Sequence, residues 1–272
     1  VDKTTGAQKY GSDIMLDGML NAAIKQPPKR GATLASFDES DIADMPGVRK
    51  VVEIDGQFPG VAVVADYWWQ AKTALDALPI EWTPGEGSDF SSSAFEAELD
   101  EGLEAEEAFV GNKIGDVDAA FDSAAQIVEA RYNAPLQNHA CMEPMNATAI
   151  WTEDKCEVWC PTQNGEAALA AAAEAAEIPI AQCDVHKLLL GGGFGRRGMN
   201  DYVTQVVKIA KQMPGTPVKL LWTREEDMEH GFYHPITKAR CQGALDADGN
   251  LTGLKIRISG QSILSGNADL QT

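Results

Sequence analysis

The stretch from residue 188 to residue 213 constrains the fold of this chain most, because a short apolar run breaks into glycines and then resumes with helical spacing. This order predicts a strand, a turn and a helix. Four glycines, at positions 191, 192, 193 and 195, remove side chains from the turn, so a ligand can lie against bare backbone N–H groups at the positive end of the helix dipole. Arg196 and Arg197 add two cations, and the turn therefore predicts an anionic, phosphorylated ligand. A glycine-rich turn with two solvated arginines stays open as the simpler interpretation.

The composition limits which partners such a turn can serve. The chain has 272 residues, 44% of them hydrophobic, which suffices for a buried core and for one large or two ordinary domains. Its formal net charge of -19 argues against nucleic acid and anionic membranes, since both attract basic surfaces. The alanine-rich run at residues 167–176 is interrupted by Glu174, so it predicts a helix of a soluble protein and no membrane span. The five cysteines form no CxxC pair, and buried free thiols are expected.

Three segments of different composition divide the chain. Residues 1–84 predict a mixed α/β unit, with a buried strand at residues 59–66 and then a helix that has Ala71 and Leu75 on one face. Residues 85–111 are strongly acidic and predict a solvated linker with one amphipathic helix near residues 95–103. Residues 112–272 interleave strands with a few helices and include a hairpin closed at residues 246–250. The predicted class is α+β.

The glycine turn also satisfies the dinucleotide fingerprint G-x-G-x-x-G, through Gly193, Gly195 and Gly198. That fingerprint requires an acidic residue about 20 residues further on, at the tip of the next strand. Thr223 and Arg224 stand at that place here. A nucleotide with a ribose phosphate tolerates an arginine there, so a Rossmann-type dehydrogenase stays open as an alternative. A P-loop is excluded, because the Gly-Lys-Ser/Thr ending is missing.

Two groups of side chains raise the question of a metal site. His139, Cys141 and Glu143 alternate in sequence, so a strand would place them on one face, although a buried structural histidine explains the pattern more simply. His230 and His234 have helical spacing, but the glycine between them and the proline after them argue against a helical metal pair.

Four motifs in order carry a family resemblance. They are MEP at residues 142–144, PTQN at 161–164, GGGFGRR at 191–197, and LLWTREEDMEHGFYHP at 220–235, which leads to DADGNL at 246–251. The chain resembles the large subunit of the molybdenum hydroxylases, the xanthine dehydrogenase and aldehyde oxidase superfamily. Within it, the chain is most similar to the isoquinoline 1-oxidoreductase β-subunit branch, where GGGFGRR replaces GGGFGGK. The resemblance implies an α/β hammerhead domain over residues 1–84 and the first part of a molybdopterin-binding domain over residues 112–272.

The resemblance also implies roles for single residues. Gln163 matches the glutamine that hydrogen-bonds the molybdenum oxo ligand, a task suited to an amide N–H. Phe194 and Gly195 match positions that line the metal and offer backbone N–H groups, while Gly192 and Gly193 allow the close approach. From their charge, Arg196 and Arg197 are expected to face the phosphates of the cofactor, which we expect in its cytosine dinucleotide form. No residue of the chain is expected to ligate the metal directly.

For the function, the resemblance implies oxidation of an N-heteroaromatic or an aldehyde with oxygen taken from water. Electrons would leave through iron–sulfur clusters on a partner subunit. The general-base glutamate of the family belongs to a later motif that this sequence does not contain, so we expect the chain to be inactive alone. Gly198 stands where xanthine-type enzymes carry a substrate-binding glutamate, which argues against a purine substrate.

Two further expectations stay open at this point. The chain starts at Val1 without an initiator methionine, as an excised piece of a longer polypeptide would, so the compartment, cytoplasm or periplasm, is undecided. A Rossmann-type nicotinamide dehydrogenase and a non-catalytic fragment that keeps the fold without cofactor remain as alternative functions.

Overall fold

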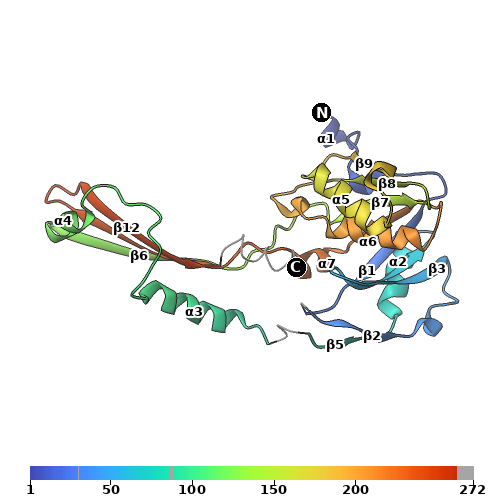
Figure 1. Ribbon diagram of the computed structural model, residues 1–272, viewed down its shortest axis with the longest axis horizontal. Helices are drawn as coiled ribbons and strands as arrows, with labels where there is room; N and C mark the ends of the chain where they lie inside the picture. The colour runs from blue at the N-terminus through green and yellow to red at the C-terminus, as the bar shows by residue number, and fades with distance from the viewer. Residues whose placement is uncertain (30, 86–88, 262–272) are drawn as a thin grey trace. The chain divides into compact units, whose positions relative to one another are not determined.

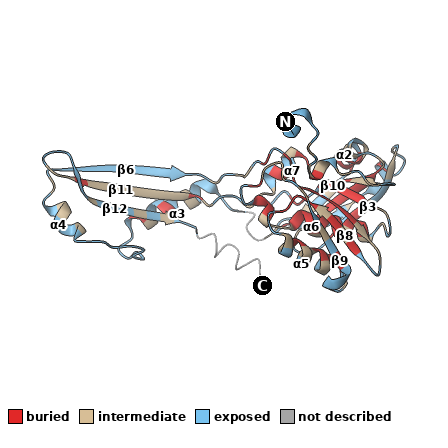
Figure 2. Ribbon diagram, turned by 90° about the horizontal axis from the view of Figure 1, so that it is seen from above, coloured by how far each residue is buried: buried red, intermediate tan, exposed pale blue. Residues whose placement is uncertain are grey.

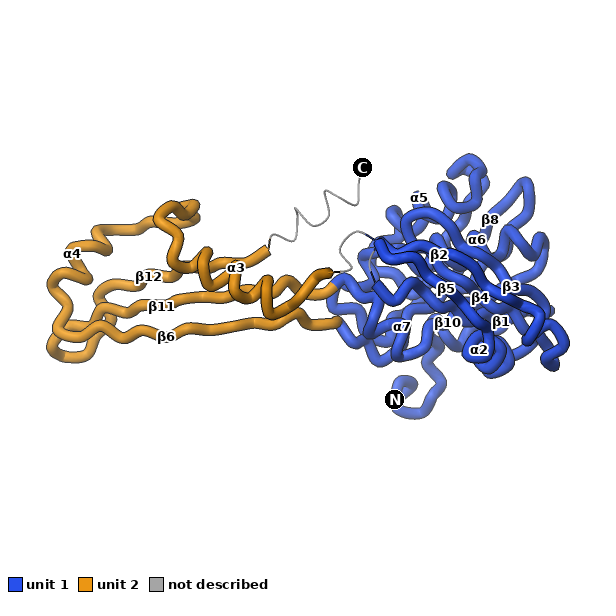
Figure 3. Tube along the Cα trace, turned by 90° about the horizontal axis from the view of Figure 1, so that it is seen from below, with its two compact units in different colours: residues 1–88, 139–232 blue, residues 89–138, 233–272 orange. Residues whose placement is uncertain are grey.

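The computed structural model describes residues 1–29, 31–85 and 89–261, and the chain divides into two compact units (Figure 3). Unit 1 comprises Val1–Ser88 and His139–Phe232, and unit 2 comprises Asp89–Asn138 and Tyr233–Thr272. Each unit is therefore built from two separate stretches of the chain. These stretches differ from the segments 1–84, 85–111 and 112–272 that the composition suggests, and that division stays a prediction.

A seven-stranded mixed sheet forms the centre of unit 1. Its strands, in spatial order, are β3 (Val48–Ile54), β4 (Gly60–Ala65), β1 (Leu20–Lys25), β10 (Val218–Leu221), β7 (Asn146–Trp151), β8 (Cys156–Cys160) and β9 (Cys183–Lys187). β1 pairs parallel with β10 and β8 pairs parallel with β9, while the other neighbours are antiparallel. This arrangement confirms the α+β class and excludes a regular doubly wound sheet.

Helices cover both faces of this sheet, which explains why β4 is buried along its whole length (Figures 1 and 2). Alternate residues of β4 enter two separate cores. Ala62 and Val64 join the larger core, formed with α5 (Gly165–Ala176) and α6 (Asp201–Lys211), and Val61 and Val63 join the smaller one beneath α2 (Trp68–Ala77). The predicted helix face is confirmed, since Ala71 and Leu75 are buried in the second core.

The remaining elements of unit 1 are short. They are α1 (Asp2–Thr5), α7 (Arg224–Glu229), the paired strands β2 (Thr33–Phe37) and β5 (Ile80–Thr83), and the 3₁₀ turns η1 (Gly11–Asp13), η2 (Glu39–Asp41), η3 (Ile180–Gln182) and η4 (Arg196–Gly198). Helix α5 begins where the Asn164 side chain accepts a hydrogen bond from the Ala167 N–H at 3.1 Å. Among the described parts of the chain, no helix is long and apolar enough to cross a membrane.

Unit 2 is a three-stranded antiparallel sheet in the order β12 (Leu251–Gly260), β11 (Thr237–Leu245) and β6 (Gln126–Ala134). The predicted hairpin is confirmed, because the Asp246 carboxylate accepts hydrogen bonds from the N–H groups of Asp248 and Asn250, each at 2.9 Å. Helix α4 (Val117–Asp122) begins where the Asp116 side chain accepts a hydrogen bond from the Ala119 N–H at 3.0 Å. The amphipathic helix expected in the acidic segment is α3 (Ser92–Glu104).

The two faces of the unit 2 sheet differ sharply. One face is polar and is bridged to α3, where Asp100 pairs with Lys238 at 2.6 Å and Glu104 pairs with Arg240 at 2.9 Å. The register places apolar side chains on the opposite face, namely Val128, Tyr132, Leu254, Ile256 and Ile258. These side chains are exposed, and β6 appears almost wholly pale blue in Figure 2.

Two predicted strands are wrong in their extent. The strand before the glycine turn ends at Lys187; the Leu188 N–H still donates to the Cys160 carbonyl of β8 at 3.0 Å, but residues 188–190 belong to no strand. Residues 138–145 form an irregular segment, and β7 begins only at Asn146. Pro144 explains the second difference, since proline cannot donate to a strand ladder.

Candidate functional site

The glycine turn at residues 191–195 leads into η4, and the predicted helix follows as α6 from Asp201. Its backbone requires glycine at two places, because φ is 103° at Gly192 and 101° at Gly195. Phe194 also has a positive φ, 53°, and its side chain is 70% exposed. A bulky residue held in this conformation is uncommon and typically occurs where the surrounding structure serves a function.

Gln163 lies against this turn from the loop between β8 and α5. Its Oε1 accepts hydrogen bonds from the backbone N–H of Gly195 at 3.1 Å and of Arg197 at 3.2 Å. A Cβ atom at position 193 would lie 2.7 Å from that oxygen, so only glycine lets Gln163 come so close. Two backbone donors thus fix the orientation of the amide, and within the described chain its Nε2 has no hydrogen-bond partner.

Three consecutive backbone N–H groups of the turn are likewise unused. Those of Gly192, Gly193 and Phe194 make no hydrogen bond within residues 1–29, 31–85 and 89–261. The Gly195 N–H, which the resemblance assigns to the cofactor together with that of Phe194, is already bound to Gln163. The donors that remain are the three turn N–H groups and the Gln163 amide.

Arg196 does not face solvent or an open phosphate site. Its side chain is 1% exposed and donates two hydrogen bonds to the Asp201 carboxylate, at 2.9 and 2.7 Å. Its guanidinium lies 5.4 Å from the Trp222 ring centre and 5.1 Å from that of Phe232. Burial alone would lower the pKa of Arg196, but the Asp201 carboxylate raises it, so the group stays a cation.

Arg197 is also fully buried. It donates from Nε to the Gly192 carbonyl at 2.7 Å and from Nη2 to the Glu143 carbonyl at 2.6 Å, and Nη2 lies 3.2 Å from Glu143 Oε2. The expectation that both arginines face cofactor phosphates, and the simpler one that they are solvated, therefore both require correction. Asp201 and Glu143 neutralise the two cations inside the protein.

The two metal hypotheses from the sequence find no support. His139, Cys141 and Glu143 lie on the irregular segment before β7, and Glu143 is engaged by the glycine turn. The ring nitrogens of His230 lie against the carbonyls of Glu226 and Pro27, at 3.1 and 3.0 Å, and those carbonyls accept hydrogen bonds from them. No group of three or more metal-binding side chains occurs among the residues that the structure describes.

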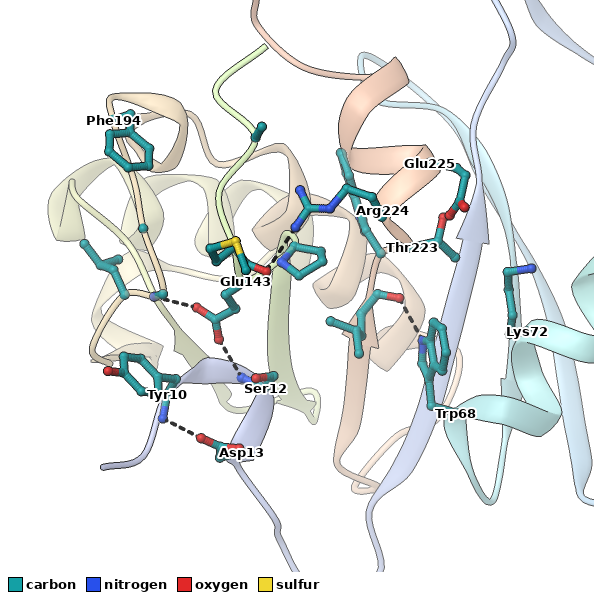
Figure 4. A pocket seen from close by; sticks show the side chains of 18 residues that line it. Tyr10, Ser12, Asp13, Trp68, Lys72, Glu143, Phe194, Thr223, Arg224 and Glu225 are labelled. Carbon is teal, nitrogen blue, oxygen red and sulfur yellow. Dashed lines mark hydrogen bonds between the residues drawn. The ribbon is translucent and has the colours of Figure 1, made fainter. Parts of the chain in front are cut away.

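An open cleft of about 1100 Å³ adjoins the turn (Figure 4). Gly191, Gly192 and Phe194 form part of its wall. Leu190 adjoins them, and the rest of the wall comes from four other places in unit 1, namely Tyr10 with Ser12 and Asp13, Trp68 with Lys72, Ala140 with residues 142–144, and residues 221–225. The cations at its edge are paired, Arg224 with Asp227 at 2.9 Å and Lys72 with Asp76. Sequence reasoning missed residues 10–13, because no local motif marks them.

The chemistry of the turn follows from these contacts. Its N–H groups at Gly192, Gly193 and Phe194 are free donors, and the carboxylate that contacts the turn, Glu143, is buried and bound to Gly191 N–H, Ser12 N–H and Arg197. A surface of this kind suits an oxo or anionic group, whose oxygens only accept hydrogen bonds.

The chain is similar to known proteins along most of its length. A family model described as the molybdopterin cofactor-binding domain matches residues 101–266. The chain is 32% identical over 265 residues to the membrane-bound aldehyde dehydrogenase [pyrroloquinoline-quinone] of Gluconacetobacter polyoxogenes, covering 93% of the chain and 33% of that protein. It is 27% identical over 273 residues to isoquinoline 1-oxidoreductase subunit beta of Brevundimonas diminuta, covering 97% and 34%. The chain thus spans about a third of these relatives.

Solved structures agree on the fold. Quinoline 2-oxidoreductase from Pseudomonas putida 86 matches with a TM-score of 0.70 and 21% identity, over 94% of this chain and 38% of that one. Aldehyde oxidoreductase from Desulfovibrio gigas matches with a TM-score of 0.67 and 21% identity, over 95% and 33%.

Proposed function

This chain belongs to the molybdopterin cofactor-binding domain family, and from that premise we propose that it forms part of the cofactor site of a molybdenum-dependent hydroxylase large subunit. The donor set at the glycine turn is the observation that carries the proposal. Gln163 Nε2 and the N–H groups of Gly192, Gly193 and Phe194 are available together, and the carboxylate that contacts the turn, Glu143, is paired with Arg197 inside the protein. A molybdopterin centre, when bound, would supply the two-electron oxidation of a substrate carbon.

The chain's own residues would bind and orient that group. Gln163 would donate from Nε2 to an oxygen of the cofactor, since its Oε1 is fixed by two backbone N–H groups. Phe194 would exclude water beside the same oxygen with its exposed ring. The Arg197 side chain would hold the turn through the Gly192 carbonyl, and neither arginine side chain would bind phosphate, because both are buried and paired with carboxylates.

The substrate and partners are proposed from the relatives. The printed names of several include aldehyde, isoquinoline and nicotinate, so we propose an aldehyde or an N-heteroaromatic substrate. The cytosine dinucleotide form of the cofactor, and a partner subunit with iron–sulfur clusters, belong to the same proposal. A Rossmann-type dehydrogenase finds no support in the mixed sheet or in any of the relatives cited.

Metal and pterin analysis of the complete purified enzyme tests the proposal. We expect about one molybdenum and one pterin per large subunit. Gln163→Ala should keep both while losing roughly 10²-fold in rate, because a positioned donor at a reacting centre is worth about that much. Gln182→Ala, at an exposed glutamine of η3, is the matched control and should behave as wild type.

Three outcomes would contradict the proposal. Pyrroloquinoline quinone in place of molybdenum would assign a different cofactor, in line with the name of one relative. Purified enzyme with neither group would support a non-catalytic protein. Wild-type turnover in Gln163→Ala would remove this residue from the site.

A further inference from the structure

We infer that Glu143 and Arg197 are positioning residues, a buried brace that holds the donor N–H groups of the glycine turn in place. The identity of the group that the donors bind rests on the proposed function, whereas the contacts of Glu143 and Arg197 with the turn do not depend on it. Glu143 is 8% exposed and Arg197 is 0% exposed. Their side chains lie beneath the turn, with Nη2 and Oε2 3.2 Å apart.

Glu143 hydrogen-bonds to the first residue of the turn, Gly191. Its Oε2 accepts from the Gly191 N–H at 2.9 Å, and its own backbone N–H donates to the Gly191 carbonyl at 3.0 Å. A Cβ atom at position 191 would collide with Glu143 Cβ, so only glycine allows the two backbones to approach this closely. The other oxygen, Oε1, accepts from the Ser12 N–H at 2.9 Å and ties residues 10–13 to the same point (Figure 4).

Arg197 hydrogen-bonds to the turn at Gly192 and to the loop that carries Gln163. Its Nε donates to the Gly192 carbonyl at 2.7 Å. Its own carbonyl accepts from the Gln163 N–H at 3.0 Å and from the Thr162 hydroxyl at 3.1 Å, and its N–H donates to Gln163 Oε1. One residue therefore links the turn to the neighbouring loop.

The brace occupies two of the acceptor groups of the turn, the carbonyls of Gly191 and Gly192. The carbonyls of Gly191, Gly192 and Gly193 are all occupied, by the Glu143 N–H, by Arg197 Nε and by the Arg196 N–H respectively. The N–H groups of Gly192, Gly193 and Phe194 make no hydrogen bond among the residues that the structure describes. Because the Glu143 charge is balanced inside the protein, it does not repel an anionic guest.

Site-resolved hydrogen exchange on the protein without added cofactor tests the brace. The Gly195 and Arg197 amides bond to Gln163 and do not touch the Glu143 side chain, so a merely local role of Glu143 would leave them unchanged. In Glu143→Gln, which keeps the shape but loses the charge, we expect these two amides to exchange about ten-fold faster or more. Val64→Ala in β4 is the control, since it opens the core without touching the turn.

A second measurement separates this inference from the proposed function. Molybdenum content of the complete enzyme should fall in Glu143→Gln but stay at the wild-type level in Val64→Ala. Exchange at Gly195 and Arg197 that matches the Val64→Ala control would overturn the brace, whatever the molybdenum content. Absence of molybdenum from wild type would contradict the proposed function and leave the exchange test of the brace intact.

Discussion

Replacing Arg196 by methionine removes a buried cation and should destabilise the folded protein strongly. The substitution keeps a side chain of similar length but leaves the Asp201 carboxylate, 2% exposed, without its bidentate partner. Removing one partner of a buried ion pair costs about 3–5 kcal/mol, because the remaining charge stays desolvated. The same truncation removes the contact of the guanidinium with the Trp222 and Phe232 rings, and that loss is part of the same cost.

Urea unfolding followed by fluorescence gives the free energy of unfolding and the m value for wild type and Arg196→Met. Arg49→Met is the control, since Arg49 is 55% exposed and pairs with Asp66 at the surface, where such pairs contribute about 0–1 kcal/mol. The double variant with Asp201→Asn should recover part of the loss, because the uncompensated carboxylate is then neutral. A loss below about 1 kcal/mol in Arg196→Met would mean that the guanidinium is solvated, and the buried pair would be refuted.

Two further predictions concern titratable groups. Burial opposes the charged form of His230, but the Glu226 carboxylate and the nearby carbonyls raise its pKa above the ordinary value of about 6.5. The stability that protonated His230 contributes should therefore be complete below about pH 6.5 and be lost as pH rises through the folded-state pKa. The urea midpoint of wild type should fall over that pH range, and the midpoint of His230→Gln should not. Burial raises the pKa of the Cys160 thiol to about 12. Iodoacetamide at pH 8 should therefore alkylate the half-buried Cys241 first in the folded protein, and Cys160 only after unfolding. Equal alkylation rates of the two cysteines, measured by peptide mass spectrometry, would contradict the burial of Cys160.

The elements that sequence reasoning predicted well are those whose signals are local. The buried strand β4 follows from a continuous apolar run, α2 from apolar residues at helical spacing, and the hairpin of β11 and β12 from its Asp-Gly turn. The glycine turn and the Gln163 loop were each recognisable from their own motifs. Their contact, between residues 32 positions apart, was implied only by the family resemblance.

The order of the sheet depended on contacts far apart in the sequence. β1 pairs with β10 almost 200 residues later, and no periodicity in either strand indicates which neighbour it takes. Such pairings are decided by how whole faces pack, since a short apolar strand fits many partners. The division of the chain into two units follows from the same long-range packing.

The sequence by itself determined that a donor-rich, glycine-lined turn would stand between a strand and a helix, because backbone freedom and helix capping are local properties. Only the tertiary structure decided what the two arginines do. A run of two arginines ordinarily indicates a solvated or ligand-facing surface, since burying a charge costs several kcal/mol. Here Asp201 and Glu143, the latter 54 residues away, supply the balancing charges, and that compensation exists only once the chain has folded.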